Sequence, residues 1–117
     1  MIDACRDWIE AALAYSGGTH TFEDVAEGIA SGRMQLWPAP DGCIVTEIVA
    51  YPRKKVCNGF LAGGDMARLL DMIPAIEAWA AAQGCASTEL TGRRGWVRVF
   101  APMGYQEAAT TLRKEIT

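Results

Sequence analysis

The stretch MARLLDMIPAIEAWAAAQGCASTELTGRRGWVRVFAPMGY, residues 66–105, decides the fold. In its first half, apolar residues such as Met66, Ile73 and Trp79 recur at helical spacings of three and four. This period predicts a long helix with one buried stripe. Gly84 predicts the end of that helix, because glycine readily adopts the left-handed conformation that closes a helix.

The second half of the stretch predicts a strand and a shorter helix. Residues 87–91 alternate between polar and less polar side chains, which favours a strand, and residues 94–101 favour a helix that Pro102 and Gly104 stop. Pro74 lies inside the pattern of the long helix. Because proline lacks an amide hydrogen and clashes with the preceding turn, we expect a kink or a new helix start there.

The residues before this stretch predict two helices and an antiparallel meander. The helices are expected at Met1–Tyr15 and Phe22–Ala30, and the strands at Met34–Trp37, Cys43–Tyr51 and Lys55–Ala62, with Gly63 and Gly64 as a link to the long helix. Thr21 and Asp24 have the spacing of a capping box at the start of the second helix. A final strand is expected from Tyr105 to about Ile116.

Length and composition predict one globular domain spanning residues 1–117. Half of the residues are hydrophobic and 21% are charged, which is ordinary for a globular protein. The net charge of −3 gives no general attraction to nucleic acid or to an anionic membrane surface. Any basic binding site must therefore be local.

The cysteines predict neither a metal site nor a disulfide framework. Cys5, Cys43, Cys57 and Cys85 are scattered without CxxC spacing, and only His20 could join them as a ligand. No stretch has the pattern of a signal peptide or a membrane span. We therefore expect reduced, buried or half-buried thiols in a cytosolic product.

Two segments resemble a known family. IEAWAAAQGCASTEL, residues 76–90, and VFAPMGYQEA, residues 99–108, together resemble the second half of the GNAT (GCN5-related N-acetyltransferase) fold. The resemblance implies an α/β (α+β) fold with a mixed, mostly antiparallel sheet flanked by helices. The GRRGW…GY segment also resembles small phage-encoded GNAT-like proteins, which implies a location in the virion or the host cytoplasm. Such proteins show that the fold alone does not imply catalysis.

The resemblance places a possible acetyl-CoA site in the turn Leu61–Met66. There the family's pyrophosphate loop carries Arg or Gln, two residues, Gly, one residue, and Gly or Ala, ahead of a helix N-terminus that favours anions. In this sequence Gly63, Gly64 and the Met66 amide would hold the phosphates. No Arg or Gln precedes the glycines, and Asp65 puts a negative charge beside the site. Asp65 is expected to be the N-cap of the helix.

The resemblance also implies acid and base groups. The position of the family's proton-donating tyrosine is Phe100, which has no proton to give, and Tyr105 and Tyr51 are possible substitutes. Glu47 and Glu89, both on predicted strands, are the candidate general bases, and the alternative is that they only face solvent. His20 is expected to be a turn residue.

A local basic cluster surrounds Trp96. Arg93, Arg94 and Arg98 beside an exposed Trp96 predict a surface for a phosphate, a nucleic-acid backbone or an acidic partner. The alternative is a solvated helix face.

Three functions remain open on the sequence. The first is a phage-type GNAT-like protein with a degenerate acetyl-CoA loop and no cofactor, acting as a virion component or protein-binding module. Its partners would be other virion or phage proteins or a second copy of itself, with no membrane involved. The second is an acetyl-CoA-dependent N-acetyltransferase with an atypical pyrophosphate loop. The third is a nucleic-acid-binding accessory factor.

Overall fold

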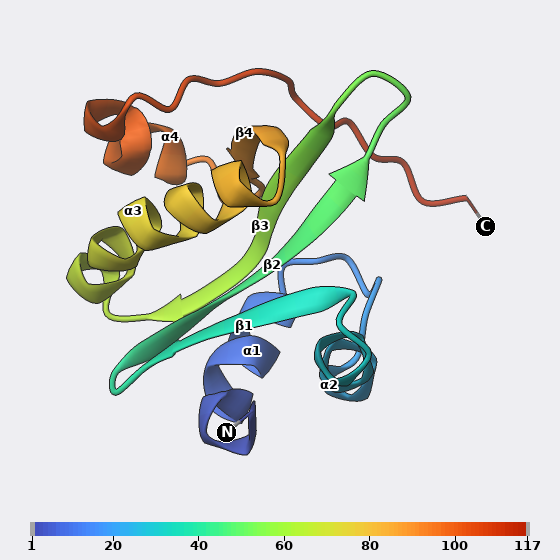
Figure 1. The fold of residues 1–117 in the computed structure, drawn as a ribbon. Helices are drawn as coiled ribbons and strands as arrows, with labels where there is room; N and C mark the ends of the chain where they lie inside the picture. The colour runs from blue at the N-terminus through green and yellow to red at the C-terminus, as the bar shows by residue number, and fades with distance from the viewer. Residues whose placement is uncertain (1, 117) are drawn as a thin grey trace.

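A four-stranded sheet forms the centre of the protein. The computed structural model describes residues 2–116. Its strands are β1 (Met34–Ala39), β2 (Gly42–Ala50), β3 (Lys55–Gly64) and β4 (Cys85–Leu90), in the spatial order β1-β2-β3-β4 (Figure 1). Neighbours among the first three strands are antiparallel, whereas β4 is parallel to β3. The mixed sheet expected from the sequence is confirmed.

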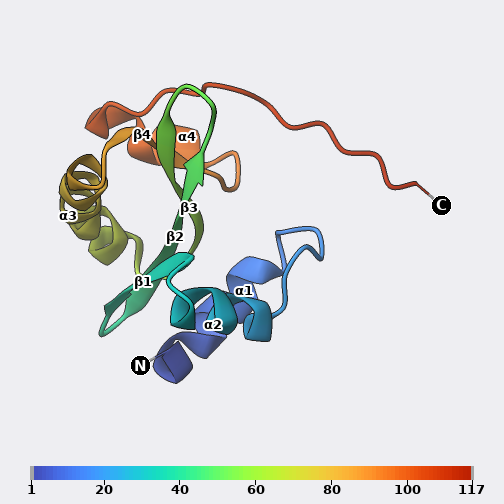
Figure 2. The same ribbon diagram turned by 45° about the vertical axis from the view of Figure 1, so that its right-hand side comes forward.

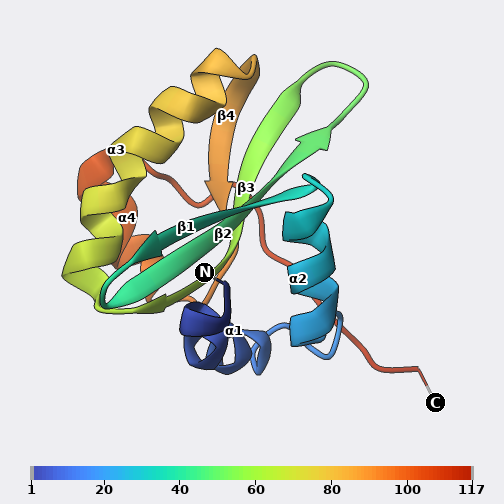
Figure 3. The ribbon, with the colours of Figure 1, turned by 60° about the horizontal axis from the view of Figure 1, so that its bottom comes forward.

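Helices cover both faces of the sheet. The short helix η1 (Ile2–Cys5), α1 (Arg6–Leu13) and α2 (Phe22–Ala30) pack on what we call the N-terminal face (Figure 2). The helix α3 (Met66–Ala82), α4 (Trp96–Phe100) and η2 (Ala101–Met103) pack on the opposite side, the C-terminal face (Figure 3). The long α3 carries the chain from the end of β3 back to the start of β4, as a parallel connection requires.

Each face has its own hydrophobic core. The buried residues of the N-terminal core are Cys5, Ile9, Phe22, Val25, Met34, Cys43, Val45 and Leu61. Those of the C-terminal core are Ile44, Cys57, Leu69, Ile73, Ile76, Ala80 and Phe100. Successive β2 residues alternate between the two lists, because neighbouring side chains of a strand point to opposite faces.

The helix ends follow the predicted capping chemistry. Thr21 Oγ1 accepts a hydrogen bond from the Asp24 amide at 3.2 Å, and Asp24 Oδ2 accepts from the Thr21 amide at 2.9 Å. The capping box is therefore confirmed. Asp65 Oδ2 accepts from the Arg68 amide at 3.1 Å, which confirms Asp65 as the N-cap of α3. Gly84 follows α3 with φ of +84°, as predicted.

The predicted final strand is wrong. Residues 106–116 are exposed and form no helix or strand, although Arg113 of this segment lies against Gly17. Leu112 is 91% exposed and Ile116 is 94% exposed. The only large apolar side chains of this segment are these two, so pairing it with β4 would bury little hydrophobic surface.

Several boundaries differ from the sequence prediction; the strand expected at 87–91 is Cys85–Leu90, and the helix expected at 94–101 is Trp96–Phe100. The long helix is continuous from Met66 to Ala82, so Pro74 starts no new helix. Pro74 lies on the exposed side of α3, where water can satisfy the carbonyl that loses its partner. The first helix begins as η1 and ends at Leu13, and Met1 lies outside the described residues. Gly63 and Gly64 belong to β3 and pair with Cys43 and Gly42.

No helix within residues 2–116 has both the length and the apolar character needed to cross a membrane.

Candidate active site

The two parallel strands separate at their carboxyl ends. β3 and β4 are paired up to Gly59 and Leu90, and the Thr91 amide donates to the Gly59 carbonyl at 3.1 Å. Beyond this point, residues 61–64 of β3 are paired only with β2, and Phe60 is unpaired. We call the resulting opening the splay. The carboxyl ends of strands where neighbours diverge are the usual place for a ligand in α/β sheets.

A row of polar side chains crosses the N-terminal face beside the splay. Glu47 pairs with Asn58, and Asn58 pairs with Glu89, so all three side chains lie on one face. Met34, the β1 partner of Glu47, belongs to the N-terminal core, which identifies that face. The structure therefore brings together the two carboxylates predicted from the sequence and places Asn58 between them.

The carboxylates of this row are available to a ligand. Glu47 is half-buried and Glu89 is exposed, and neither forms an ion pair with any residue in the range 2–116. Asn58 is held in place, because Thr91 Oγ1 donates to its Oδ1 at 3.0 Å. Sequence reasoning missed Asn58, since its role depends on the register of three strands.

His20 lies at the side of this row. The ring of His20, in the loop between α1 and α2, packs on Phe60 with the ring centroids 5.4 Å apart. Phe60 is an extra residue in β3, because Val45 pairs with Leu61 whereas Thr46 pairs with Gly59. This bulge turns both Phe60 and Leu61 toward the N-terminal core. His20 is thus a loop residue, as predicted, and it contacts the first residue of the splay.

The glycines of the possible pyrophosphate loop pack against protein. A Cβ on Gly63 would lie 2.9 Å from Trp8 Cβ, and Gly63 therefore lets α1 approach β3. Gly64 has φ of +108°, and a Cβ there would lie 2.3 Å from the Asp41 carbonyl oxygen. These contacts explain both glycines by backbone packing, without a ligand.

The start of α3 keeps two free amides next to a carboxylate. Within residues 2–116 the amide hydrogens of Met66 and Ala67 have no acceptor, which is the condition for binding an anion at a helix N-terminus. Asp65 opposes this, because its carboxylate lies at the same helix end. Arg68 donates from Nε to Asp41 Oδ1 at 3.1 Å, so its charge is shared with a second acid. The loop fits the phosphates of acetyl-CoA through its amides only.

Phe100 has no hydroxyl group, and Tyr105 instead places one near the sheet. Phe100 is buried, and its ring contacts those of Trp96 and Tyr105 edge to face, with centroids 5.7 Å and 5.8 Å apart. The Tyr105 hydroxyl donates to Glu77 Oε2 at 2.7 Å and lies 2.8 Å from Thr88 Oγ1. Burial, together with Glu77, raises the pKa of Tyr105 to about 12, against the lowering effect of the Thr88 hydrogen bond.

Tyr105 also lines a small cavity between β3, β4 and α3. The cavity has a volume of about 10 Å³, and Cys57, Gly59 and Thr88 are among its other lining residues. This volume suffices for about one water molecule. The other proposed substitute, Tyr51, is 53% exposed beside the turn between β2 and β3. Of the two, only Tyr105 reaches the strands that form the splay.

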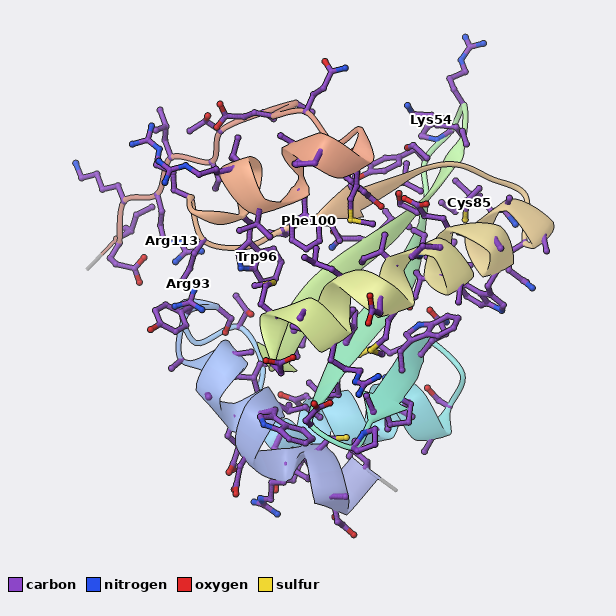
Figure 4. All side chains as sticks on the ribbon, turned by 90° about the vertical axis from the view of Figure 1, so that its left-hand side faces the viewer. Lys54, Cys85, Arg93, Trp96, Phe100 and Arg113 are labelled. Atoms are coloured by element: carbon purple, nitrogen blue, oxygen red, sulfur yellow. The ribbon has the colours of Figure 1, made fainter. Side chains whose placement is uncertain are left out.

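The predicted basic cluster is only partly exposed. Arg93, Arg94 and Arg98 are exposed, and none has an ion-pair partner in the described part of the chain. Trp96 was expected to be exposed and is half-buried instead, because it packs against the C-terminal core (Figure 4). The Arg93 guanidinium lies over the ring of Tyr15, 4.6 Å from its centroid.

The cysteines are free thiols at separate places in the cores. Cys5, Cys43 and Cys57 are buried and Cys85 is half-buried. Burial, together with the neighbouring Cys5, raises the pKa of Cys43 to about 12. The residues from 2 to 116 contain no group of three His, Cys, Asp or Glu side chains arranged to hold a metal ion.

Comparison with known proteins shows the fold. No protein-family model and no curated protein matches the sequence. Among solved structures, an acetyltransferase from Trypanosoma brucei superposes with a TM-score of 0.66 at 10% identity, covering 95% of this chain and 91% of that one. A probable acetyltransferase gives a TM-score of 0.68 at 9% identity, with 99% and 91% covered.

A third similar structure is an aminoglycoside acetyltransferase from an uncultured soil metagenomic sample, in complex with sisomicin. Its TM-score is 0.69 at 9% identity, with 99% of this chain and 88% of that chain covered. At such identities the likeness concerns the fold. The chain has the GNAT-like fold that residues 76–90 and 99–108 indicated.

Proposed function

We propose that this protein is an N-acetyltransferase that moves an acetyl group from acetyl-CoA to an amine. The observation that carries the proposal is the row formed by Glu47, Asn58 and Glu89 beside the splay. The row lies on the face opposite α3, so an amine on the N-terminal face and a cofactor at the start of α3 would meet at the splay. The acetyltransferases with the same fold support this choice.

Each group in the site has a chemical role in this proposal. Acetyl-CoA supplies an activated acetyl thioester. The carboxylate of Glu89 or Glu47 accepts the proton of the ammonium group, directly or through water, so that the nitrogen has a free lone pair. The Asn58 side chain orients the amine between them. The Met66 and Ala67 amides hold phosphate oxygens. When the amine nitrogen bonds to the acetyl carbon, the carbon–sulfur bond breaks and coenzyme A would leave as a thiolate. That thiolate would take a proton from water or from Tyr105, which keeps its hydroxyl proton at neutral pH since its pKa is about 12.

The proposal is tested by acetylation of a panel of primary amines that includes an aminoglycoside. We expect Glu47→Gln or Glu89→Gln to lower kcat/KM by about 10²-fold, the lower end of the usual effect of a general base, and to remove the acidic limb of its pH profile. Glu107→Gln is the control, because Glu107 lies in the exposed segment after η2. Unchanged rates in both glutamate variants, or no acetylation of any amine, would refute the proposal.

The second candidate is a binding module that takes no cofactor. It is favoured by Asp65, which caps α3 where phosphates would bind, and by Gly63 and Gly64, whose packing needs no ligand. This is the function first expected from the sequence. A role in a virion stays a prediction, to be tested by recovering the protein from purified particles at fixed stoichiometry. Nucleic-acid binding also stays a prediction, and it requires salt-sensitive oligonucleotide retention that Arg94→Glu removes.

A further inference from the structure

Two arginines from distant parts of the sequence meet the loop that follows α1. Arg93, in the loop between β4 and α4, lies over the ring of Tyr15. Arg113, in the segment after η2, lies against Gly17, where a Cβ would be 2.2 Å from the guanidinium nitrogen Nη1. Figure 4 shows the two arginines next to each other beside this loop. The structure therefore gathers two positive charges around the segment from Tyr15 to Gly17.

Among residues 2–116, neither Arg93 nor Arg113 has an acidic partner. The arginines with an ion pair in residues 2–116 are Arg6, Arg33 and Arg68. A guanidinium that stacks on an aromatic ring uses its flat face, which leaves the N–H groups at its edge free to bind an anion. The backbone of Arg93 is also fixed, because its carbonyl accepts from the Trp96 amide at 3.0 Å.

The position of this cluster relates it to the carboxylate row. Arg93 follows Glu89 by four residues, so their Cα atoms are at most roughly 14 Å apart even along an extended chain. Tyr15 belongs to the same connection as His20, which packs on Phe60 at the splay. Both observations place the positive cluster beside the open end of the sheet, with the Cα atom of Arg93 within roughly 14 Å of that of Glu89.

We propose that Tyr15, Arg93 and Arg113 bind an anionic group of the acceptor, so that the substrate is an amine that also carries a carboxylate or a phosphate. The inference rests on the proposed acetyl transfer. The amine of such a compound reaches Glu47 and Glu89 while its anion pairs with the guanidinium groups. Arginine suits both anions, because its planar N–H groups match two oxygens at once.

Matched pairs of acceptors test the charge requirement. Alanyl-alanine is compared with alanyl-alanine amide, and phosphoethanolamine with ethanolamine, by their kcat/KM in acetylation. We expect about a tenfold preference for the charged member of at least one pair, and the preferred pair tells carboxylate from phosphate. Arg93→Gln and Arg113→Gln should remove most of the preference, whereas Arg53→Gln, in the turn after β2, should keep it. Equal kcat/KM within both pairs would overturn the inference.

Two glycines supply a second test with the same backbone change. Gly17 and Gly18 have φ of +77° and +78°, so alanine strains both positions equally. A Cβ on Gly17 meets Arg113, whereas a Cβ on Gly18 meets nothing within 4 Å. Gly17→Ala should therefore weaken the preference for the charged acceptor, and Gly18→Ala should not. The same loss in both variants would contradict a role for Arg113.

A binding measurement without acetyl-CoA separates this inference from the proposed function. Alanyl-alanine should shift the NMR signals of the Tyr15 ring, assigned with Tyr15→Phe, and alanyl-alanine amide should not. The shift should be lost in Arg93→Gln. If this holds but no amine is acetylated, the anion site stands and the acetyl transfer fails. If amines are acetylated but neither the dipeptide nor phosphoethanolamine perturbs Tyr15, the inference fails alone.

Discussion

Asp65 stabilises the start of α3 and disfavours an anion at the same helix end. Its carboxylate caps α3 through the Arg68 amide, a contact that stabilises a helix by about 1 kcal/mol. The same charge acts against a phosphate at the Met66 and Ala67 amides, by up to about 1 kcal/mol. Because these magnitudes are small beside the total affinity for a large cofactor, Asp65 would weaken the proposed acetyl-CoA site without abolishing it.

At the residue scale, Tyr105 predicts a pH dependence of stability. Its pKa is raised from 10.0 to about 12 by burial and by Glu77. Between these values the unfolded chain has lost the phenol proton and the folded chain retains it, so this contribution is complete below pH 10 and decreases as pH rises toward 12. In denaturant titrations from pH 9 to 12, Tyr105→Phe should lower the free energy of unfolding at pH 9 and flatten its decrease above pH 10.

The control for this prediction is Tyr51→Phe, because Tyr51 is 53% exposed and accepts or donates no side-chain hydrogen bond within residues 2–116. Tyr51→Phe should leave the free energy of unfolding at pH 9, and its decrease with rising pH, as they are in the unchanged protein. If the free energy of unfolding of Tyr105→Phe decreased above pH 10 as steeply as that of the unchanged protein, another group would be the cause of that decrease.

Sequence reasoning at this scale succeeded where a role depends on near neighbours. The roles of Thr21, Asp24 and Asp65 follow from the residues within one helical turn, and all three are confirmed. The places of Asn58 and Arg113 depend on strand register and on a contact between distant segments. No local pattern contains that information.

At the scale of elements, we expect the contribution of a leucine to the stability of the protein to depend on how it packs. The exposed segment after η2 allows a test. Leu112 is 91% exposed in residues 106–116, whereas Leu61 is 3% exposed in β3. We expect Leu112→Ala to change the free energy of unfolding by less than about 0.5 kcal/mol, and Leu61→Ala to lower it by about 2–5 kcal/mol. Chemical denaturation of the two variants measures both. A large loss in Leu112→Ala would mean that the segment packs as a strand.

The helices and strands also show which sequence patterns are sufficient to predict secondary structure. The helical period of residues 66–82 predicted α3 well, and the alternation of β2 predicted a buried strand. The strand expected for residues 105–116 does not form, because β-branched residues such as Thr110 and Thr111 favour a strand only when it has a hydrophobic surface to cover. Pro74 is tolerated within α3 because it lies on the solvent side.

At the scale of the whole molecule, the fold separates the two parts of the proposed site. The sheet has the free amides of α3 at one side of the splay and the carboxylate row on its N-terminal face. The family resemblance of residues 76–90 and 99–108 predicted this fold correctly. It did not predict the row itself, which appears only when the register of β2, β3 and β4 is known.

The central claim is that the start of α3 holds the phosphates of acetyl-CoA, and Met66 allows a direct test. Met66 is the first residue of α3, where proline is well tolerated, and Asp65 has the extended conformation that precedes proline. Met66→Pro therefore removes one free amide and keeps the helix. Met66→Ala is the control, since it removes the same side chain from the C-terminal core and keeps the amide.

The claim is tested by calorimetric titration of the unchanged protein, Met66→Ala and Met66→Pro with acetyl-CoA. The account predicts saturable binding at one site in the unchanged protein, similar binding in Met66→Ala, and about a tenfold weaker affinity in Met66→Pro, as expected for the loss of one hydrogen bond to a charged group. Absence of binding in the unchanged protein, or equal affinities in the two variants, would contradict it.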